Sequence, residues 1–80
     1  MYLKDAIEQR IESLCKERNI TVNKLCMISG VTQSTLANLR QRPTTNVSTL
    51  TILRLCRGLD ITMDEFFNDE IFRTNDFDDD

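Results

Sequence analysis

The stretch of sequence that decides the fold is TVNKLCMISGVTQSTLANLRQR, residues 21–42. It holds two short apolar patterns of helical period, over residues 22–29 and 33–41, and they meet at Gly30. Glycine takes the left-handed backbone conformation without a Cβ clash, so we expect the first helix to end there. Two helices joined by such a short turn form a helix-turn-helix, although the spacing also fits an ordinary corner in a helical bundle.

Caps and apolar positions within this stretch support the two helices. Thr21 and Thr32 stand just ahead of the two patterns, where an N-cap side chain accepts from the free amides of a first turn. Val31 is expected to pack into the corner between the helices. The expected inward side chains are those of Leu25, Cys26, Ile28, Leu36 and Leu39.

The second helix has an outward face of short hydroxyl and amide side chains, where an ordinary solvated face carries Glu and Lys. Its outward positions are Gln33, Ser34, Thr35, Ala37, Asn38 and Gln41. Gln and Asn can make bidentate hydrogen bonds to adenine, and a hydroxyl can donate or accept. In a helix-turn-helix the second helix enters the major groove of DNA, so this face favours DNA binding over the ordinary corner.

The charge of the chain is divided unevenly along it. The net charge is −3, but residues 1–68 hold nine Lys and Arg against seven Asp and Glu, and residues 69–80 hold one Arg against six acids. We therefore predict a helix-turn-helix domain over residues 1–68 and an acidic, partly disordered tail over residues 69–80. Residues 32–57 contain no acid, and their four cations suit a surface that faces phosphates; they are Arg40, Arg42, Arg54 and Arg57.

The composition argues against several other classes of protein. No stretch approaches the roughly 20 apolar residues of a membrane span, and the N-terminus lacks the apolar centre of a signal peptide, so we expect a cytoplasmic protein. The chain has no histidine and no CxxC pair, which argues against a metal site, a cofactor site or an enzyme. Cys15, Cys26 and Cys56 each lie beside an apolar stripe and are expected in the core.

Three further helices are predicted from the rest of the chain, over residues 3–18, 49–59 and 63–68. Ser48 and Thr62 are expected to cap the last two, and Gly58 and Asp60 to mark the end of the fourth helix. The expected inward side chains are those of Leu3, Ala6, Ile7, Ile11, Leu14, Ile52, Leu55 and Leu59. The fold class is therefore all-α with five helices.

These five helices resemble the Cro/repressor family, the lambda-repressor-like DNA-binding domains of phage and bacterial transcriptional regulators. The resemblance covers residues 3–67, and its strongest local matches are SGVTQSTL, residues 29–36, and LDITMDEFF, residues 59–67. It implies a compact five-helix domain with the helix-turn-helix at the second and third helices. The recognition helix would then begin at Gln33.

The resemblance also implies roles for the site residues. Gln33, Ser34 and Asn38 would lie nearest the base edges of double-stranded DNA, and Thr32 and Thr35 near the groove wall or the phosphates. In the loop after the recognition helix, Thr44, Thr45 and Asn46 would approach the DNA backbone. Phosphate contacts would fix the register, while base contacts would give the specificity.

The sequence departs from the family pattern at three places. Val22 stands where the family often has a phosphate-binding glutamine, so Asn23 or the helix amides would have to replace that contact. Arg42 stands where a glycine often follows the recognition helix, and it adds a positive charge. Cys15 and Arg40 occupy the positions of a common arginine–glutamate pair, which leaves Arg40 free to turn toward phosphate.

The expected function is a sequence-specific DNA-binding transcriptional regulator, a small bacterial or phage repressor, that acts as a homodimer. The alternative is a protein-interaction module on the same fold, an anti-repressor or antitoxin-like partner, with weak DNA binding. Candidate dimer contacts are Leu50, Leu53, Phe66, Phe67, Ile71 and Phe72. No small-molecule ligand is evident, and the acidic tail is compatible with the start of a linker to a further domain.

Overall fold

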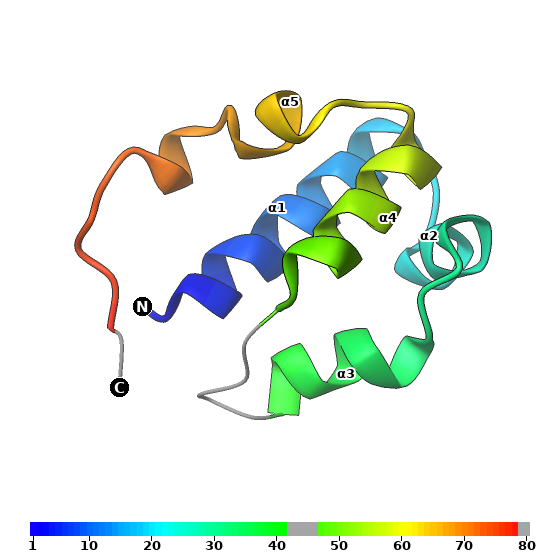
Figure 1. Cartoon of the computed structure of the whole chain (residues 1–80), viewed down its shortest axis with the longest axis horizontal. Coiled ribbons are helices and arrows are strands. Elements are labelled where there is room, and N and C mark those ends of the chain that lie inside the picture. Colours follow the sequence, from blue (N-terminus) through cyan, green and yellow to red (C-terminus); the bar gives the residue numbers. More distant parts are fainter. Residues whose placement is uncertain (42–46, 79–80) are drawn as a thin grey trace.

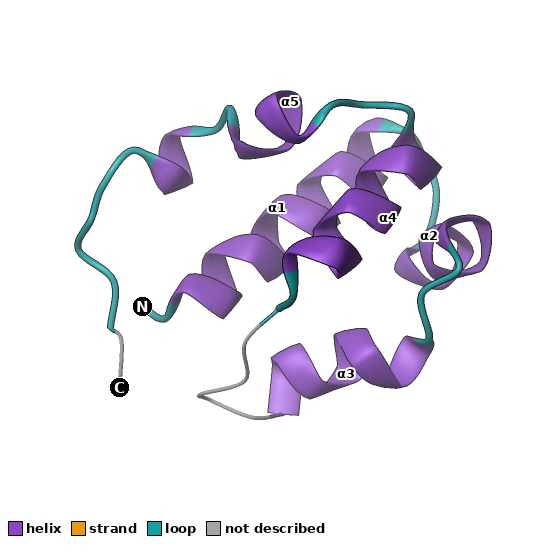
Figure 2. Cartoon of the chain, viewed as in Figure 1, coloured by secondary structure: helices purple, strands orange, loops and turns teal. Residues whose placement is uncertain are grey.

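The computed structural model describes residues 1–41 and 47–78, with the side chains of residues 1–38 and 47–78. This part of the chain forms five α-helices and one short 3-10 helix, with no strand (Figure 2). They are α1 (Leu3–Glu17), α2 (Val22–Ser29), α3 (Gln33–Gln41), α4 (Thr49–Leu59), α5 (Met63–Phe67) and the 3-10 helix η1 (Glu70–Phe72). The predicted all-α, five-helix fold is confirmed.

The helix-turn-helix packs against both of the longer helices, α1 and α4. α2 packs on α4 and α3 packs on α1, while α5 packs on α4. In Figure 1, α5 lies along one edge of the molecule and α3 along the opposite edge. α3 therefore forms an outer side of the molecule that α5 does not cover.

All five α-helices contribute side chains to one core. Phe66, Leu25 and Leu55 are fully buried at its centre. The three cysteines are buried as predicted, and burial raises the pKa of the Cys15 and Cys56 thiols above the usual value. The core consists of Ile7, Ile11, Leu14, Cys15, Leu25, Cys26, Val31, Leu36, Ile52, Leu55, Cys56, Leu59 and Phe66, with Ala6 buried as well.

Two residues predicted to face inward, Leu3 and Ile28, lie at the surface instead. Their side chains are 47% and 48% exposed. Leu3 is the first residue of α1 and stands at the end of the apolar stripe. In α2 the inward face is formed by the neighbouring Leu25 and Cys26 and by Ser29, four and three residues later, so Ile28 falls beside that face.

The predicted N-caps of α2, α4 and α5 form as expected. The hydroxyls of Thr21, Ser48 and Thr62 accept hydrogen bonds from the backbone N–H three residues later, at 3.0, 3.0 and 3.2 Å. Each bond satisfies an amide that has no partner inside its own helix. These local bonds explain why the starts of the three helices are visible in the sequence.

Helix ends are set by residues in the left-handed conformation. Gly30 ends α2 with a φ of 69°, and Asp60 ends α4 with a φ of 56°. Asn19, between α1 and α2, also has a φ of 56°. Asn and Asp tolerate this conformation better than other side chains, while glycine adopts it without strain.

Gly58 lies inside the last turn of α4, and its role is packing. A Cβ atom at this position would lie 3.1 Å from Cβ and 3.3 Å from Cα of Ser29, both closer than ordinary contact. The Ser29 hydroxyl is buried there without a hydrogen-bond partner among the described residues. The absence of a side chain at Gly58 therefore allows α2 and α4 to approach closely.

Replacing Gly58 with valine is expected to lower the free energy of unfolding by about 2–3 kcal/mol, because the added carbons would force α4 away from α2. Urea unfolding followed by circular dichroism measures this loss. Arg54→Val is the matched control, since Arg54 is exposed on the same helix and its replacement reports only the lower helix propensity of valine. Equal losses for both variants would contradict the packing role.

Arg10 of α1 bonds to the end of α5 and to the segment that follows it. The side chain of Arg10, 12% exposed, donates from Nε to the carbonyl oxygen of Phe66 (2.7 Å) and from Nη2 to that of Glu65 (2.8 Å). Its Nη1 also forms an ion pair with Asp69 at 3.3 Å. The division of the chain at residue 68 and the partial disorder of residues 69–80 remain predictions about the chain in solution.

Candidate nucleic-acid interface

The position of α3 is fixed by its buried side and by the turn that precedes it. After Gly30, the backbone N–H of Val31 donates to the carbonyl oxygen of Cys26 at 3.1 Å, which closes the end of α2. The side chains of Val31 and Leu36 are only 8% and 6% exposed. As predicted, Val31 fills the corner of the helix-turn-helix. The side of α3 opposite Leu36 consequently faces away from the core.

The described residues at the start of α3 differ in exposure. Three successive exposed side chains are followed by half-buried ones, and Leu36 is buried, as predicted. The exposed residues are Thr32, Gln33 and Ser34, and the half-buried residues are Thr35, Ala37 and Asn38.

Some predicted site residues lie outside the described part of the structure. They are Arg42, Thr44, Thr45 and Asn46, together with the side chains of Arg40 and Gln41. The side chain of Leu39, predicted to lie in the core, is also outside the described part. Their roles stay predictions.

Three hydroxyls at the start of α3 form a cluster. The Thr32 Oγ1 atom lies 2.8 Å from Oγ1 of Thr35 and 3.2 Å from Oγ of Ser34, within hydrogen-bond distance of both. The backbone N–H of Thr35 also donates to the carbonyl oxygen of Thr32, at 3.1 Å. Each of the three side chains is thus already held in place by a neighbouring hydroxyl.

The two amide side chains that the structure describes in α3 differ from these hydroxyls. The carboxamides of Gln33 and Asn38 have no hydrogen-bond partner among the described residues. Gln33 also lines a shallow hollow of about 200 Å³ between α2 and α3, together with Asn23, which was predicted to replace the missing glutamine of α2. Carboxamides without a partner among the described residues are available to bind an external ligand.

Charge is segregated along the chain. Residues 18–59, which include α2, α3 and α4, hold six Lys and Arg and no acid, while the other residues hold four Lys and Arg and all thirteen acids. The acid-bearing α5 lies on the edge opposite α3 (Figure 1). Lys24, Arg54 and Arg57 are exposed. Lys24 was missed as a site candidate, although it lies three residues after a cap at the start of α2.

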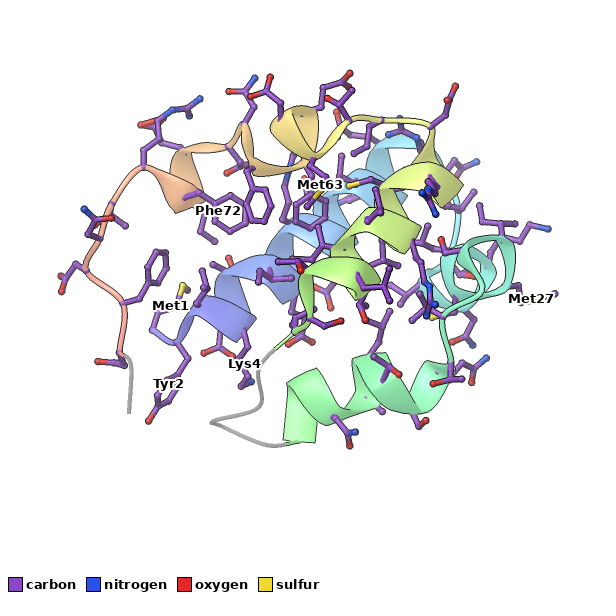
Figure 3. All side chains as sticks on the ribbon, in the orientation of Figure 1. Met1, Tyr2, Lys4, Met27, Met63 and Phe72 are labelled. Atoms are coloured by element: carbon purple, nitrogen blue, oxygen red, sulfur yellow. The ribbon has the colours of Figure 1, made fainter. Side chains whose placement is uncertain are left out.

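The residues predicted to form a dimer surface differ in exposure: one is buried, two are exposed and three are half-buried. Phe66 is fully buried, so it is removed from the candidate surface. Leu50 and Phe67 are 50% and 37% exposed, whereas Phe72 points inward (Figure 3) and packs on the core. Leu53 and Ile71 are half-buried.

An apolar side chain that is more exposed than any of these candidates lies on another helix. Met27, on the outer side of α2, is 73% exposed and extends away from the molecule (Figure 3). It is followed directly by the exposed Ile28. This apolar surface was not predicted, because a pattern of helical period identifies apolar positions without showing which of them a neighbouring helix covers.

A helix-turn-helix whose second helix carries amides without a partner in the described part of the chain, in a segment free of acids, is typical of one class of nucleic-acid-binding domain. The sequence identifies the family within that class. The family model of the Cro/C1-type HTH DNA-binding domain matches residues 10–70, and the chain belongs to this family. The predicted resemblance is thereby confirmed. The family consists of DNA-binding domains and not of enzymes, in agreement with the prediction.

The fold is shared with a solved phage protein. The crystal structure of the prophage Lp1 protein 11 is similar with a TM-score of 0.82, over 92% of this chain and 99% of that chain, at 21% sequence identity. No curated protein matches the sequence. In residues 1–41 and 47–78, no helix has both the length and the apolar character needed to cross a membrane.

Proposed function

We propose that this protein is a sequence-specific transcriptional regulator, in its simplest form a cytoplasmic repressor, that inserts α3 into the major groove of double-stranded DNA. The observation that carries the proposal is the exposed start of α3. There the amides of the exposed Gln33 and the half-buried Asn38 have no partner among the described residues, while the buried Leu36 anchors the helix. The acid-free segment 18–59 supports it, because such a segment does not repel the phosphate backbone.

Roles within the interface follow from chemistry and position. Gln33, Ser34 and Asn38 are proposed to lie nearest the base edges, and Thr32 and Thr35 to lie near the groove wall or the phosphates. Lys24 lies in α2, and Arg54 and Arg57 lie in α4, the helix on which α2 packs. Their cationic side chains are exposed and suit phosphates. Arg40, Arg42, Thr44, Thr45 and Asn46 are proposed for the DNA backbone on the family resemblance alone.

A homodimer is part of the proposal. One α3 makes few contacts, and two copies bound to half-sites one helical turn apart, about 34 Å, would add theirs. The candidate dimer surface combines the exposed Leu50 and Phe67 with the half-buried Leu53, Ile71 and Phe72. Phe66 is excluded because it is buried inside the protomer.

The test is a selection from a random duplex library at two salt concentrations, with wild type beside Gln33→Ala/Asn38→Ala. We expect wild type to enrich a two-fold symmetric motif. The double variant should bind that motif about 100-fold more weakly, because two bidentate base contacts are lost. Its salt dependence should stay unchanged, because the phosphate contacts remain. The matched control is Gln9→Ala/Asn75→Ala, which removes two exposed amides far from α3 in the sequence.

The outcomes separate two functions. A motif without two-fold symmetry would contradict the homodimer but keep the DNA-binding regulator. An equal loss in the control variant would contradict base binding by α3. The second candidate is a protein-interaction module with weak DNA binding, and the overall charge of −3 favours it because free DNA repels an acidic protein. Absence of salt-dependent duplex binding by wild type would select that alternative.

A further inference from the structure

The start of α3 carries no charge. Residues 33–38, QSTLAN, contain no Lys, Arg, Asp or Glu. In the major groove, guanine is bound specifically by the bidentate donors of Arg or Lys, and cytosine by an Asp or Glu that accepts from its amino group. This part of the helix therefore lacks the side chains that distinguish a G·C pair most strongly.

The hydroxyls in the same segment are already engaged. Serine and threonine hydroxyls can bond to any base, so Ser34 and Thr35 do not by themselves favour one base pair. Both lie within hydrogen-bond distance of Oγ1 of Thr32, at 3.2 and 2.8 Å. These contacts hold the hydroxyls to one another, whereas the amides of Gln33 and Asn38 have no partner among the described residues.

The unpaired groups match an A·T pair. A carboxamide offers one donor and one acceptor side by side, which is the complement of N7 and the amino group of adenine. Gln33 and Asn38 carry such carboxamides without a partner among the described residues. Ala37 lies four residues after Gln33, and thus on the same row of the helix; its half-buried methyl group is the kind of apolar contact that recognises the thymine methyl.

From these observations we infer that the base pairs contacted by the start of α3 are A·T pairs. Gln33 and Asn38 each bind an adenine, and Ala37 contacts the methyl group of a thymine. The inference rests on the proposed function, since it specifies which DNA sequence the same surface selects. It is limited to base pairs within reach of residues 33–38, and base pairs elsewhere in the operator are not constrained.

The test begins from the motif that wild type enriches from random duplexes. Repeating the selection with Gln33→Ala and with Asn38→Ala identifies the base pairs whose preference each variant loses. Both sets are expected to be A·T. Gln33→Arg should change the preference at its own position from adenine to guanine. G·C pairs at the positions that the alanine variants relax would overturn the inference.

Base analogues then test the individual contacts. Placing 7-deaza-adenine at the Gln33-dependent position removes the N7 acceptor and should weaken wild-type binding about tenfold, but should leave Gln33→Ala unaffected. Deoxyuridine in place of the contacted thymidine removes one methyl group and should cost about fourfold. The same analogues outside the half-sites are the control. An analogue effect that persists in the alanine variant would overturn the assignment.

The two proposals can fail separately. If wild type enriches a motif with G·C pairs under Gln33 and Asn38, the A·T inference is wrong while the DNA-binding regulator stands. If no duplex is bound with salt dependence, the proposed function is wrong and the inference falls with it. Circular dichroism of each variant confirms that a lost preference does not come from unfolding.

Discussion

Replacing Phe66 with alanine is expected to lower the free energy of unfolding by about 3–5 kcal/mol. The side chain is fully buried, and the centroid of its ring lies 5.0 Å from the ring centroid of Phe67 and 6.4 Å from that of Phe72. Domains are stabilised by only about 0.05–0.15 kcal/mol per residue, so this loss removes much of the total in a small domain. α5 should then detach, because Phe66 is its buried residue.

The neighbouring phenylalanine provides a matched control. Phe67→Ala removes the same ring from the same helix, but its side chain is 37% exposed, so we expect a loss of about 1 kcal/mol or less. Urea unfolding of both variants, followed by circular dichroism, measures the difference. Equal losses would contradict the assignment of Phe66 to the core. Phe67→Ala also tests the dimer, since it alters the candidate surface while leaving the core intact.

Replacing Arg10 with methionine is expected to lower the free energy of unfolding by about 3 kcal/mol and to release the segment after α5. The guanidinium donates to two carbonyl oxygens at the end of α5, those of Glu65 and Phe66, and pairs with Asp69. Removing Arg10 takes away the side-chain donor to the partly buried carbonyl oxygen of Phe66, in the last turn of α5, where carbonyls lack a partner within the helix. The carbonyl oxygen of Glu65 keeps its bond from the backbone N–H of Asn68, at 3.3 Å. Methionine keeps much of the aliphatic length without the donors.

Two further variants make the Arg10 experiment decisive. Arg10→Lys keeps the charge, but a single ammonium cannot reproduce three bonds in a plane, so most of the loss should remain. Arg73→Met removes an arginine that pairs with Glu70 while half exposed, and it should cost less than about 1 kcal/mol. Hydrogen exchange at the amides of Ile71 and Phe72 reports detachment of η1. Wild-type stability in Arg10→Lys would contradict the proposed role of the Arg10 guanidinium in holding the segment after α5.

The helices of this protein are predictable because the signals that define them are local. The predicted bounds of α2, α3 and α4 agree with the structure. Thr21, Ser48 and Thr62 form bonds with amides only three residues away, and Gly30 adopts its left-handed conformation within the turn itself. Such features depend on neighbours in the chain and so can be recognised in the sequence.

Several features that the sequence did not reveal involve residues far apart in the chain. Arg10 bonds to the end of α5, more than 50 residues away, and Gly58 lies against Ser29. A five-residue helix is too short for its period to show which phenylalanine is buried, so Phe66 was placed on an outer surface. Lys4 is only 8% exposed despite its charge; its ammonium lies 2.8 Å from the carboxylate of Asp5 and lowers the pKa of that residue.

The candidate interface was predictable as a set of exposed residues. The outward positions of α3 followed from helical period once Leu36 was taken as the inward side chain, and the structure exposes Gln33 and Ser34 as expected. The hydroxyl cluster at Thr32 was not predictable, because it depends on side-chain rotamers. Which surface another protomer covers also cannot be derived from one chain, since apolar side chains are exposed on several helices.

The separation of charge has a consequence for the speed of association with a polyanion. Six cations and no acid lie in residues 18–59, and the other residues carry nine more acids than cations, so the molecule has an electric dipole. In the field of a DNA duplex this dipole experiences a torque that turns the α2–α4 side toward the phosphates before contact. Fewer collisions then occur in unproductive orientations, although the net charge is repulsive. The rate constant of association should consequently fall steeply as added salt shortens the range of the field.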